Sequence, residues 1–336
     1  MKNFIVFIIL ILFTSCATTG SKGAPQWMTN LEAEFPGSRY LAAIGSGDSR
    51  RRAQEDAAAF LAQQFTVNIK VDTVAQQKYA ELTKDDSRYR ESELMLTHTI
   101  GTQASEELIN LKYSDAYRDS SGITYVVAYL ERQPTSLIYR DIITKDLAKA
   151  EEFYNRASSV TGSLRRYAFY DAAYTMKLNA ERMLDQLRII FPPMVPMLEM
   201  QFNFKKITEA RDKAAENLSY SIAVTGDDGR VAGIIRDTMR EQSISYSPNG
   251  SMTIRGTWSI TPVSVNPNFR SVQWTANISL FDETGTTIAT FYRDARENGI
   301  TEEQAVNFAY REFQRHLSRE LGRDIQSYLT RTATSR

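Results

Sequence analysis

This chain of 336 residues contains few cysteine and histidine side chains, the types most often used as metal ligands and catalytic groups. It has one cysteine, Cys16, and two histidines, His98 and His316. Zinc sites and cysteine–histidine catalytic pairs need several such side chains close together. Two histidines far apart in sequence can meet in a fold, but a surface or edge position is the simpler expectation for each. We therefore predict no metal and no cofactor.

Two pairs of adjacent acidic residues are the remaining candidates for acid–base chemistry. They are Asp227-Asp228 and Asp282-Glu283. Each pair lies close to a glycine, where acidic side chains commonly stabilise turns. We interpret both as turn residues, predict no catalytic residues, and predict that the protein is not an enzyme.

A glycine turn, Gly45-Ser46-Gly47, invites a phosphate-binding interpretation. It lacks the third glycine of the dinucleotide fingerprint, and no Gly-Lys-Ser or Gly-Lys-Thr follows it. The simpler interpretation is a turn that needs permissive backbone angles. The neighbouring Arg50-Arg51-Arg52 point in different directions on a helix, so we expect a solvated first turn.

The cysteine follows a segment typical of a secretory signal. Lys2 precedes an unbroken apolar run, Phe4 to Phe13. This run is about half of the roughly 20 residues needed to span a bilayer. Phe13-Thr14-Ser15-Cys16 resembles the lipobox of bacterial lipoproteins. The resemblance implies that a signal peptide, residues 1–15, is removed and that Cys16 carries a diacylglyceryl group and an acylated, for example palmitoylated, amino terminus.

Membrane lipid, held through acylated Cys16, is therefore the first predicted partner. Each buried methylene adds about 0.8 kcal/mol, so two or three chains on one residue anchor a protein almost permanently. Ala17, with no acidic residue at that position, favours the outer membrane by resemblance to sorted lipoproteins. Two alternatives stay open: an ordinary signal peptide cut near Ala17, and an uncleaved anchor.

The composition argues against a partner that is bound mainly through net charge. The chain has 40 Lys plus Arg and 40 Asp plus Glu. With no net charge, no global field draws it toward nucleic acid, and we predict no nucleic-acid partner. Residues 16–26 contain Thr, Gly, Ser, Lys and Pro, which is typical of a flexible tether. The length suggests about two domains beyond it.

Residues 27–133 are predicted to form the first domain. We expect strands at 40–44 and 65–74 around a helix at 50–64, because the apolar residues change from alternation to helical spacing. Residues 77–103 are polar, and we expect them to be partly helical or irregular. Strands at 107–117 and 122–130 should form a hairpin through the turn at 119–122. This is an α+β unit with a mostly antiparallel sheet.

The stretch Tyr40–Val74 resembles the Lpp-twenty lipoproteins. That family has an apolar strand, a Gly-x-Gly turn, a helix with repeated alanines and a strand rich in Val and Ile. Pro25-Gln26-Trp27 and the strand Tyr125–Leu130 match it as well. The resemblance implies an envelope lipoprotein, in some members tied to flagella or cell-surface structures, and it implies no catalytic residues.

Residues 134–218 are predicted to be a helical hairpin with a connector. Helices at 135–160 and 164–190 are joined by Thr161-Gly162-Ser163, and a third helix covers 205–217. An aromatic stripe and a methionine-rich connector are a candidate partner surface, although core and connector packing are the simpler interpretations. Its residues are Tyr167, Tyr170, Tyr174, Met194, Met197 and Met200.

Residues 219–330 are predicted to form a second small domain in the order β-α-β-β-β-α. We expect a strand at 220–224, a helix at 231–242 and three antiparallel strands within 252–293. A last helix should begin at a capping box formed by Thr301 and Gln304. At fold level this is similar to the amino-terminal domain of TolB. The predicted fold class is α+β: two small two-layer α/β domains flanking a long helical hairpin.

These observations predict a lipid-anchored envelope lipoprotein in the outer membrane, facing the periplasm. It would act as a non-enzymatic binding or structural protein whose partners are other envelope proteins. The alternative is an assembly or regulatory factor that forms a homo-oligomer and serves a flagellar structure, a secretion structure or a wall synthase. Fold-level similarity alone does not decide between them.

Overall fold

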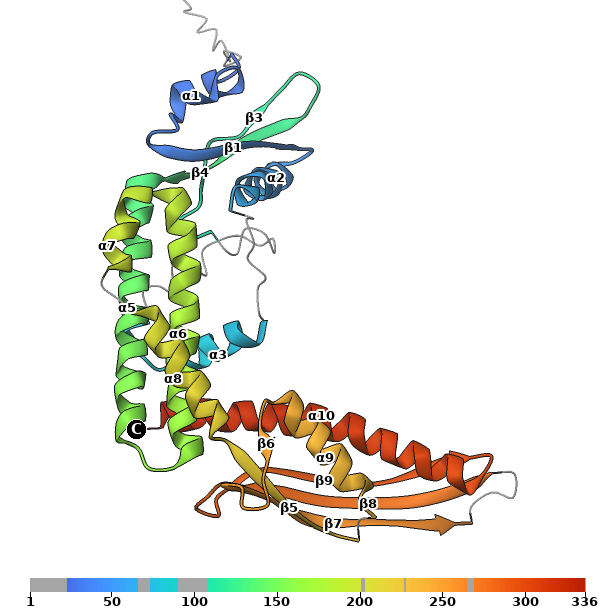
Figure 1. The fold of residues 1–336 in the computed structure, drawn as a ribbon. Coiled ribbons are helices and arrows are strands. Elements are labelled where there is room, and N and C mark those ends of the chain that lie inside the picture. The colour runs from blue at the N-terminus through green and yellow to red at the C-terminus, as the bar shows by residue number, and fades with distance from the viewer. Residues whose placement is uncertain are drawn as a thin grey trace, which may run out of the picture. The chain divides into compact units, whose positions relative to one another are not determined.

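The computed structural model describes residues 23–65, 73–89, 108–200, 203–226, 228–264 and 269–335, so Cys16 and the predicted signal peptide lie outside the described residues. The fold class is α+β, as predicted. The chain forms two compact units (Figure 1). The first comprises Met1–Leu61 and Lys112–Leu130; the second comprises Ala62–Leu111 and Glu131–Arg336.

The first unit is a small sheet with one long helix. Its sheet has the order β1-β4-β2, and β3 also pairs with β4; β2 and β3 are both antiparallel to β4. Its elements, in chain order, are η1 (Gln26–Met28), α1 (Leu31–Glu34), β1 (Tyr40–Gly47), α2 (Arg50–Gln63), β2 (Lys112–Tyr113), β3 (Tyr117–Arg118) and β4 (Thr124–Glu131).

Close approach of α2 to β1 explains the glycine and the alanines of this unit. Ala53 and Ala57 are fully buried on α2. A Cβ atom placed on Gly45 would lie 2.0 Å from the backbone nitrogen of Ala57. Only glycine fits this position, and small residues on the helix permit the contact.

The predicted strand at 107–117 is wrong in extent, because in its described part, residues 108–117, only Lys112, Tyr113 and Tyr117 are in register with β4. The side chain of Ser114 accepts a hydrogen bond from the backbone N–H of Val127 at 2.9 Å, while its own N–H donates to the Val127 carbonyl at 2.9 Å. A side chain thus replaces a backbone acceptor and interrupts the ladder between β2 and β3.

The helical part of the second unit matches the predicted hairpin closely. Two long helices, α5 (Arg132–Ser159) and α6 (Ser163–Ile190), lie side by side (Figure 1). The remaining elements here are α3 (Thr73–Thr83), η2 (Ser87–Tyr89), η3 (Pro192–Met194), α7 (Val195–Glu199) and α8 (Phe204–Glu216).

The predicted strand at 65–74 falls mostly outside the described residues. Its last two residues, Thr73 and Val74, belong to α3 rather than to a strand. The residues that follow, Ala75 to Leu82, include many good helix formers, so the helix extends back through Val74.

The carboxy-terminal part of the second unit is a five-stranded sheet of order β6-β5-β7-β8-β9. Strands β7, β8 and β9 are antiparallel as predicted, whereas β5 is parallel to β6 and β7. Its elements are β5 (Ser219–Thr225), α9 (Arg230–Glu241), β6 (Ser245–Tyr246), β7 (Met252–Val263), β8 (Arg270–Phe281), β9 (Thr287–Gly299) and α10 (Glu302–Thr334).

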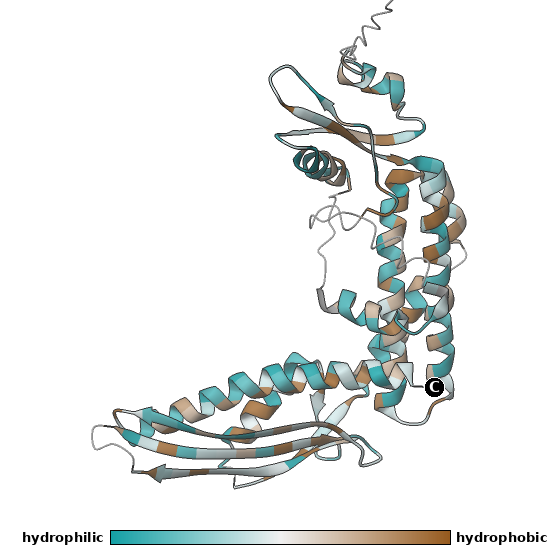
Figure 2. Ribbon diagram, turned by 180° about the vertical axis from the view of Figure 1, so that it is seen from behind, coloured by the Kyte–Doolittle hydropathy of each residue, from teal (hydrophilic) through white to brown (hydrophobic). Residues whose placement is uncertain are grey.

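One face of this sheet carries the core. Hydrophobic and hydrophilic residues alternate along its long strands (Figure 2). Trp258, Trp274 and Phe313 meet beneath α10, with the two indole rings stacked at 5.4 Å. Leu164 and Ala168 of α6 belong to the same hydrophobic cluster. The hairpin and the sheet therefore share a continuous core within this unit.

Candidate functional site

The helical hairpin contains a buried ionic cluster centred on α6. Lys78 of α3 forms an ion pair with Asp171, and both side chains are about nine-tenths buried. Arg211 of α8 binds the other carboxylate oxygen, with Nε 3.1 Å from Oδ1. One carboxylate thus receives a cation from each of two helices, which is the arrangement that a buried charge requires.

A second buried carboxylate lies on α5. Asp146 is fully buried and accepts hydrogen bonds from the Tyr79 hydroxyl at 2.9 Å and from Asn179 Nδ2 at 2.6 Å. Burial raises the pKa of Asp146 to about 7, because desolvation disfavours the charged form. Burial also lowers the pKa of Lys78 to about 7, and the nearby charge of Arg211 adds to this effect.

These contacts dock α3 onto the hairpin. Lys149 of α5 adds a third link, 3.4 Å from Asp86, which follows α3. Each member of the cluster has a partner on another element, so its present role is structural. Sequence analysis missed it. The available signal was that Asp146 lies among Ile142, Ile143 and Leu147, on the face that should be apolar.

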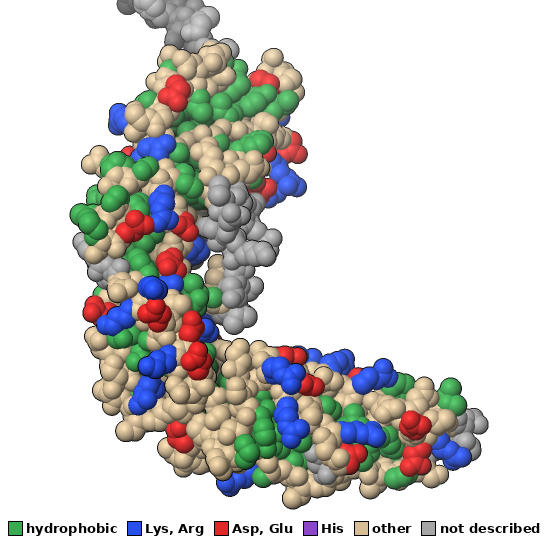
Figure 3. Space-filling model, viewed as in Figure 1, with side chains coloured by type: hydrophobic (Ala, Val, Ile, Leu, Met, Phe, Trp, Pro, Cys, Tyr) green, Lys and Arg blue, Asp and Glu red, His purple; other side chains and the backbone are tan. Residues whose placement is uncertain are grey.

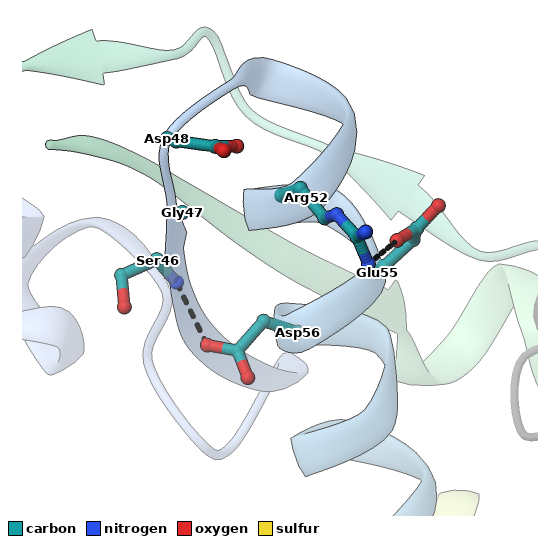
Figure 4. A pocket seen from close by; sticks show the side chains of 6 residues that line it. All are labelled: Ser46, Gly47, Asp48, Arg52, Glu55 and Asp56. Carbon is teal, nitrogen blue, oxygen red and sulfur yellow. Dashed lines mark hydrogen bonds and ion pairs between the residues drawn. The ribbon is translucent and has the colours of Figure 1, made fainter.

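The predicted glycine turn is the end of strand β1, and its residues Ser46 and Gly47 line a shallow hollow of about 480 Å³, which Figure 4 shows. The backbone N–H of Ser46 donates to Asp56 at 2.9 Å. Arg52 lies 3.5 Å from Glu55. A phosphate would meet three carboxylates here, Asp48, Glu55 and Asp56, and one arginine that already has a partner. The predicted turn is wrong, because these residues continue strand β1 and neither Gly45 nor Gly47 has a positive φ. The acidic lining also does not favour a phosphate.

The acidic pair at the β8–β9 turn has structural partners. One oxygen of Asp282 accepts hydrogen bonds from the Thr284 and Thr286 backbones, at 2.8 Å each. The other oxygen accepts one from the Tyr328 hydroxyl at 3.0 Å. Burial alone would raise the pKa of Asp282, but these hydrogen bonds together hold it below its ordinary value.

Its neighbour Glu283 caps the amino-terminal end of helix α6. The Glu283 carboxylate accepts hydrogen bonds from the Ser163 backbone N–H at 3.0 Å and from its hydroxyl at 2.7 Å. Ser163 is the first residue of α6, so the carboxylate lies at the positive end of the helix dipole. An acidic side chain far away in sequence thus satisfies an unpaired helix N–H.

The second acidic pair and the histidines offer no catalytic grouping in the described chain. Asp227 and His98 lie outside the described residues. Asp228 accepts a bond from the Arg230 backbone at 3.1 Å, as a turn residue does. His316, expected at a surface or an edge, is instead buried on α10, with Nδ1 2.9 Å from an Arg319 nitrogen. Burial lowers the pKa of His316, and the nearby positive charge of Arg293 is the second-largest cause of this shift.

The predicted tyrosine stripe faces α8. The Arg211 guanidinium lies over the Tyr174 ring at 4.7 Å and over the Tyr167 ring at 5.9 Å. The rings of Tyr170 and Tyr154 lie 5.3 Å apart, and Lys206 lies over the Tyr154 ring at 4.2 Å. All three stripe tyrosines are half-buried.

The methionine-rich connector is more exposed. Met197 is 47% exposed and Met200 is 82% exposed, whereas Met194 is half-buried. Val195 and Leu198 between them are buried and hold α7 in place. A partner surface at the methionines and tyrosines stays a prediction.

Neither metal-binding groups nor membrane-spanning helices occur in the described part of the chain. Within it, no three His, Cys, Asp or Glu side chains are placed to hold a metal ion. None of its helices combines the length and apolarity needed to cross a bilayer. Positive and negative side chains are interspersed on the face that Figure 3 shows.

Comparison with known proteins supports the resemblance seen in the sequence. Residues 25–131 match the family model described as LPP20 lipoprotein. This confirms the Lpp-twenty resemblance for that third of the chain. No curated protein matches the chain. The similarity of residues 219–330 to TolB is not supported by these matches and stays a prediction.

Three solved structures show distant similarity. A minor lipoprotein from Acinetobacter baumannii is 14% identical over 32% of this chain and 92% of its own, with a TM-score of 0.26. The secreted protein HP1454 from Helicobacter pylori is 11% identical over 88% and 99%, with a TM-score of 0.41. The rare lipoprotein B from Shewanella oneidensis is 11% identical over 32% and 92%, with a TM-score of 0.23. Scores this low support no functional assignment.

Proposed function

We propose that this protein is a bacterial cell-envelope lipoprotein, anchored by acylated Cys16 to the periplasmic face of the outer membrane, and that it acts as a non-enzymatic binding or structural protein. The observation that carries this is the LPP20 lipoprotein match, which begins at Pro25, directly after a short tether that follows the lipobox-like Phe13–Cys16. Two independent parts of the sequence thus point to the same class of protein.

The contacts of the acidic residues give these groups structural roles. Asp282 and Glu283 hold a turn and cap a helix, and Asp146 and Asp171 dock α3. General acid–base catalysis needs a carboxyl group within reach of a substrate. These carboxyl groups make structural hydrogen bonds and ion pairs instead. Met197 and Met200 are the exposed apolar positions that we propose contact an envelope partner, because methionine adapts to irregular surfaces.

Metabolic labelling with an alkyne analogue of palmitate tests the anchor. The wild-type chain should incorporate the label, and mass spectrometry should find an acylated amino terminus at Cys16. Cys16→Ser should lose the label, while the matched variant Ser15→Ala should keep it. An unlabelled wild-type chain whose amino terminus lies after Ala17 would show an ordinary signal peptide and refute the proposal.

Density-gradient separation of the two membranes tests the location. The labelled chain should sediment with outer-membrane markers, since Ala17 offers no acidic retention signal. Recovery of the labelled chain in the inner membrane would retain the lipoprotein assignment and refute the outer-membrane part.

A further inference from the structure

The carboxy-terminal sheet ends in an unusually long free edge. β9 spans 13 residues, Thr287–Gly299, and it is the last strand of the order β6-β5-β7-β8-β9. In the described part of the chain its ladder runs to β8 alone. Along an edge strand, alternate N–H and C=O groups point outward and can pair with another strand. Most strands have about 3 to 10 residues, so this is a large template.

The charges on this edge are complementary to themselves when the strand is read in the opposite direction. The sequence from 293 to 297 is Arg-Asp-Ala-Arg-Glu. If two copies of β9 pair antiparallel about Ala295, Arg293 of one copy lies opposite Glu297 of the other. Asp294 then lies opposite Arg296. Both relations occur twice by symmetry, so four pairs of opposite charges face each other; Arg293 also lies 3.7 Å from Glu320 of α10 in its own chain.

The pairing register is selective. In a twofold antiparallel pair, directly opposite residues share a face of the sheet, so the axis passes through one residue position. An axis at Arg293, Asp294, Arg296 or Glu297 would set that charge opposite itself. Like charges directly opposite each other destabilise a sheet, and opposite charges stabilise it. Ala295 is therefore the favoured centre in this stretch.

Exposed apolar side chains lie in β9 and directly after it. Tyr292 is 64% exposed and Ile300 is 78% exposed. Pairing about Ala295 places Tyr292 opposite Asn298 of the second copy, and brings Ile300, which follows the strand, near Thr290 of the second copy. Both large side chains would then be partly covered.

We propose that β9 pairs antiparallel with β9 of a second copy of this chain, centred on Ala295, so that the two five-stranded sheets join. The partner is a second copy because the edge is complementary to itself in charge. If these edge charges instead served to keep strands apart, the wild-type chain would be monomeric. This proposal does not depend on acylation of Cys16.

A charge reversal tests the pairing, together with a second substitution that should restore it. The full acylated chain in detergent should sediment as a dimer. Arg296→Asp sets two negative charges opposite each other and should weaken the dimer at least tenfold, about 1.4 kcal/mol. The double variant Asp294→Arg/Arg296→Asp restores opposite charges and should restore the dimer. Arg255→Asp makes the same charge change at an exposed position on the inner strand β7 and should have no effect.

A cross-linking measurement fixes the register and guards against misfolding. A photoreactive phenylalanine at Tyr292 should give a dimer band whose cross-linked peptide contains Asn298. Circular dichroism should show that each variant stays folded. A monomeric wild-type chain, a dimer that Arg296→Asp leaves intact, or a cross-link to a different peptide would each overturn the proposal.

Discussion

A buried carboxylate on α5 gives the protein a specific pH dependence at the residue scale. Asp146 keeps its proton up to about pH 7 in the folded protein, whereas its ordinary value is 3.8. The folded state therefore binds more protons between these two values. The stability that this proton provides is complete below the ordinary value and is lost as pH rises through the folded value.

We predict that Asp146→Asn flattens the decline in unfolding free energy between about pH 4 and about pH 7. Asparagine cannot ionise, so the linked proton disappears even if the substitution changes stability by a constant amount. Urea unfolding across this range measures the slope. Asp141→Asn, at an exposed position on the same helix, is the control and should leave the slope unchanged. Parallel curves for Asp146→Asn and wild type would contradict the assignment.

The link between α5 and α6 depends on one glycine. Gly162 has a φ of +97°, and a Cβ atom there would lie 2.1 Å from Glu283 Oε1. Alanine would be strained in this backbone conformation and would displace the carboxylate that caps α6. Gly229 has a similar φ of +98°, but a Cβ atom there meets no other atom within 4 Å.

We predict that Gly162→Ala lowers the free energy of unfolding more than Gly229→Ala does. Both substitutions carry a cost of about 1–3 kcal/mol for a non-glycine residue at positive φ, although the two glycines differ in ψ, at 133° and −15°. Only the first also loses the helix cap, which is worth about a further 0.5–2 kcal/mol. Chemical denaturation of both variants measures the difference. Equal losses would show that the Glu283 cap contributes nothing.

At the scale of elements, α3 is held to the hairpin by polar contacts. Removal of one partner from a buried ion pair costs about 3–5 kcal/mol, because the remaining charge stays buried. In Lys78→Ala, Asp171 keeps Arg211 as a partner, so α6 and α8 stay joined while α3 loses its ion pair. The effect should therefore be local.

We predict that Lys78→Ala increases hydrogen exchange across 73–83 with little change in α5 and α6. Hydrogen exchange followed by mass spectrometry resolves these segments. Lys84→Ala, at an exposed position just past α3, is the control. Unchanged protection of 73–83 in Lys78→Ala would show that apolar contacts alone hold α3.

The long elements could be predicted from sequence, because their signal is periodic. The helices predicted at 135–160 and 164–190 are found at Arg132–Ser159 and Ser163–Ile190. Gly162 and the proline after Phe191 mark their ends without reference to the rest of the fold. The Thr301 cap is also observed, with Gln304 N–H donating to its hydroxyl at 3.2 Å.

The short elements and the buried cluster depend on contacts between distant residues. β6 has two residues and is defined by its parallel pairing with β5. The interruption between β2 and β3 follows from the Ser114–Val127 hydrogen bonds. The pairing of Lys78 with Asp171 joins positions 93 residues apart. Local propensity contains no information on such pairs.

At the scale of the whole molecule, α10 connects the parts of the second unit. Its residues Phe313 and Leu329 lie in the core of the carboxy-terminal sheet. Near its end, Ala333 lies in the hairpin core with Phe153 and Phe169. Arg156 also donates to the Ser335 carbonyl at 3.1 Å. The last turn of the chain therefore stabilises helices that lie far earlier in sequence.

We predict that Ala333→Asp destabilises the hairpin, although the substitution lies in the last turn of α10. A carboxylate at this 1%-exposed position would be buried among the cluster's apolar side chains, and burial of a polar group there costs about 1–3 kcal/mol or more. Hydrogen exchange should increase in α5 and α6 around Phe153 and Phe169. Thr334→Asp, at the adjacent exposed position, should leave exchange there unchanged. If Ala333→Asp affected only the end of α10, the hairpin core would be independent of the carboxy terminus.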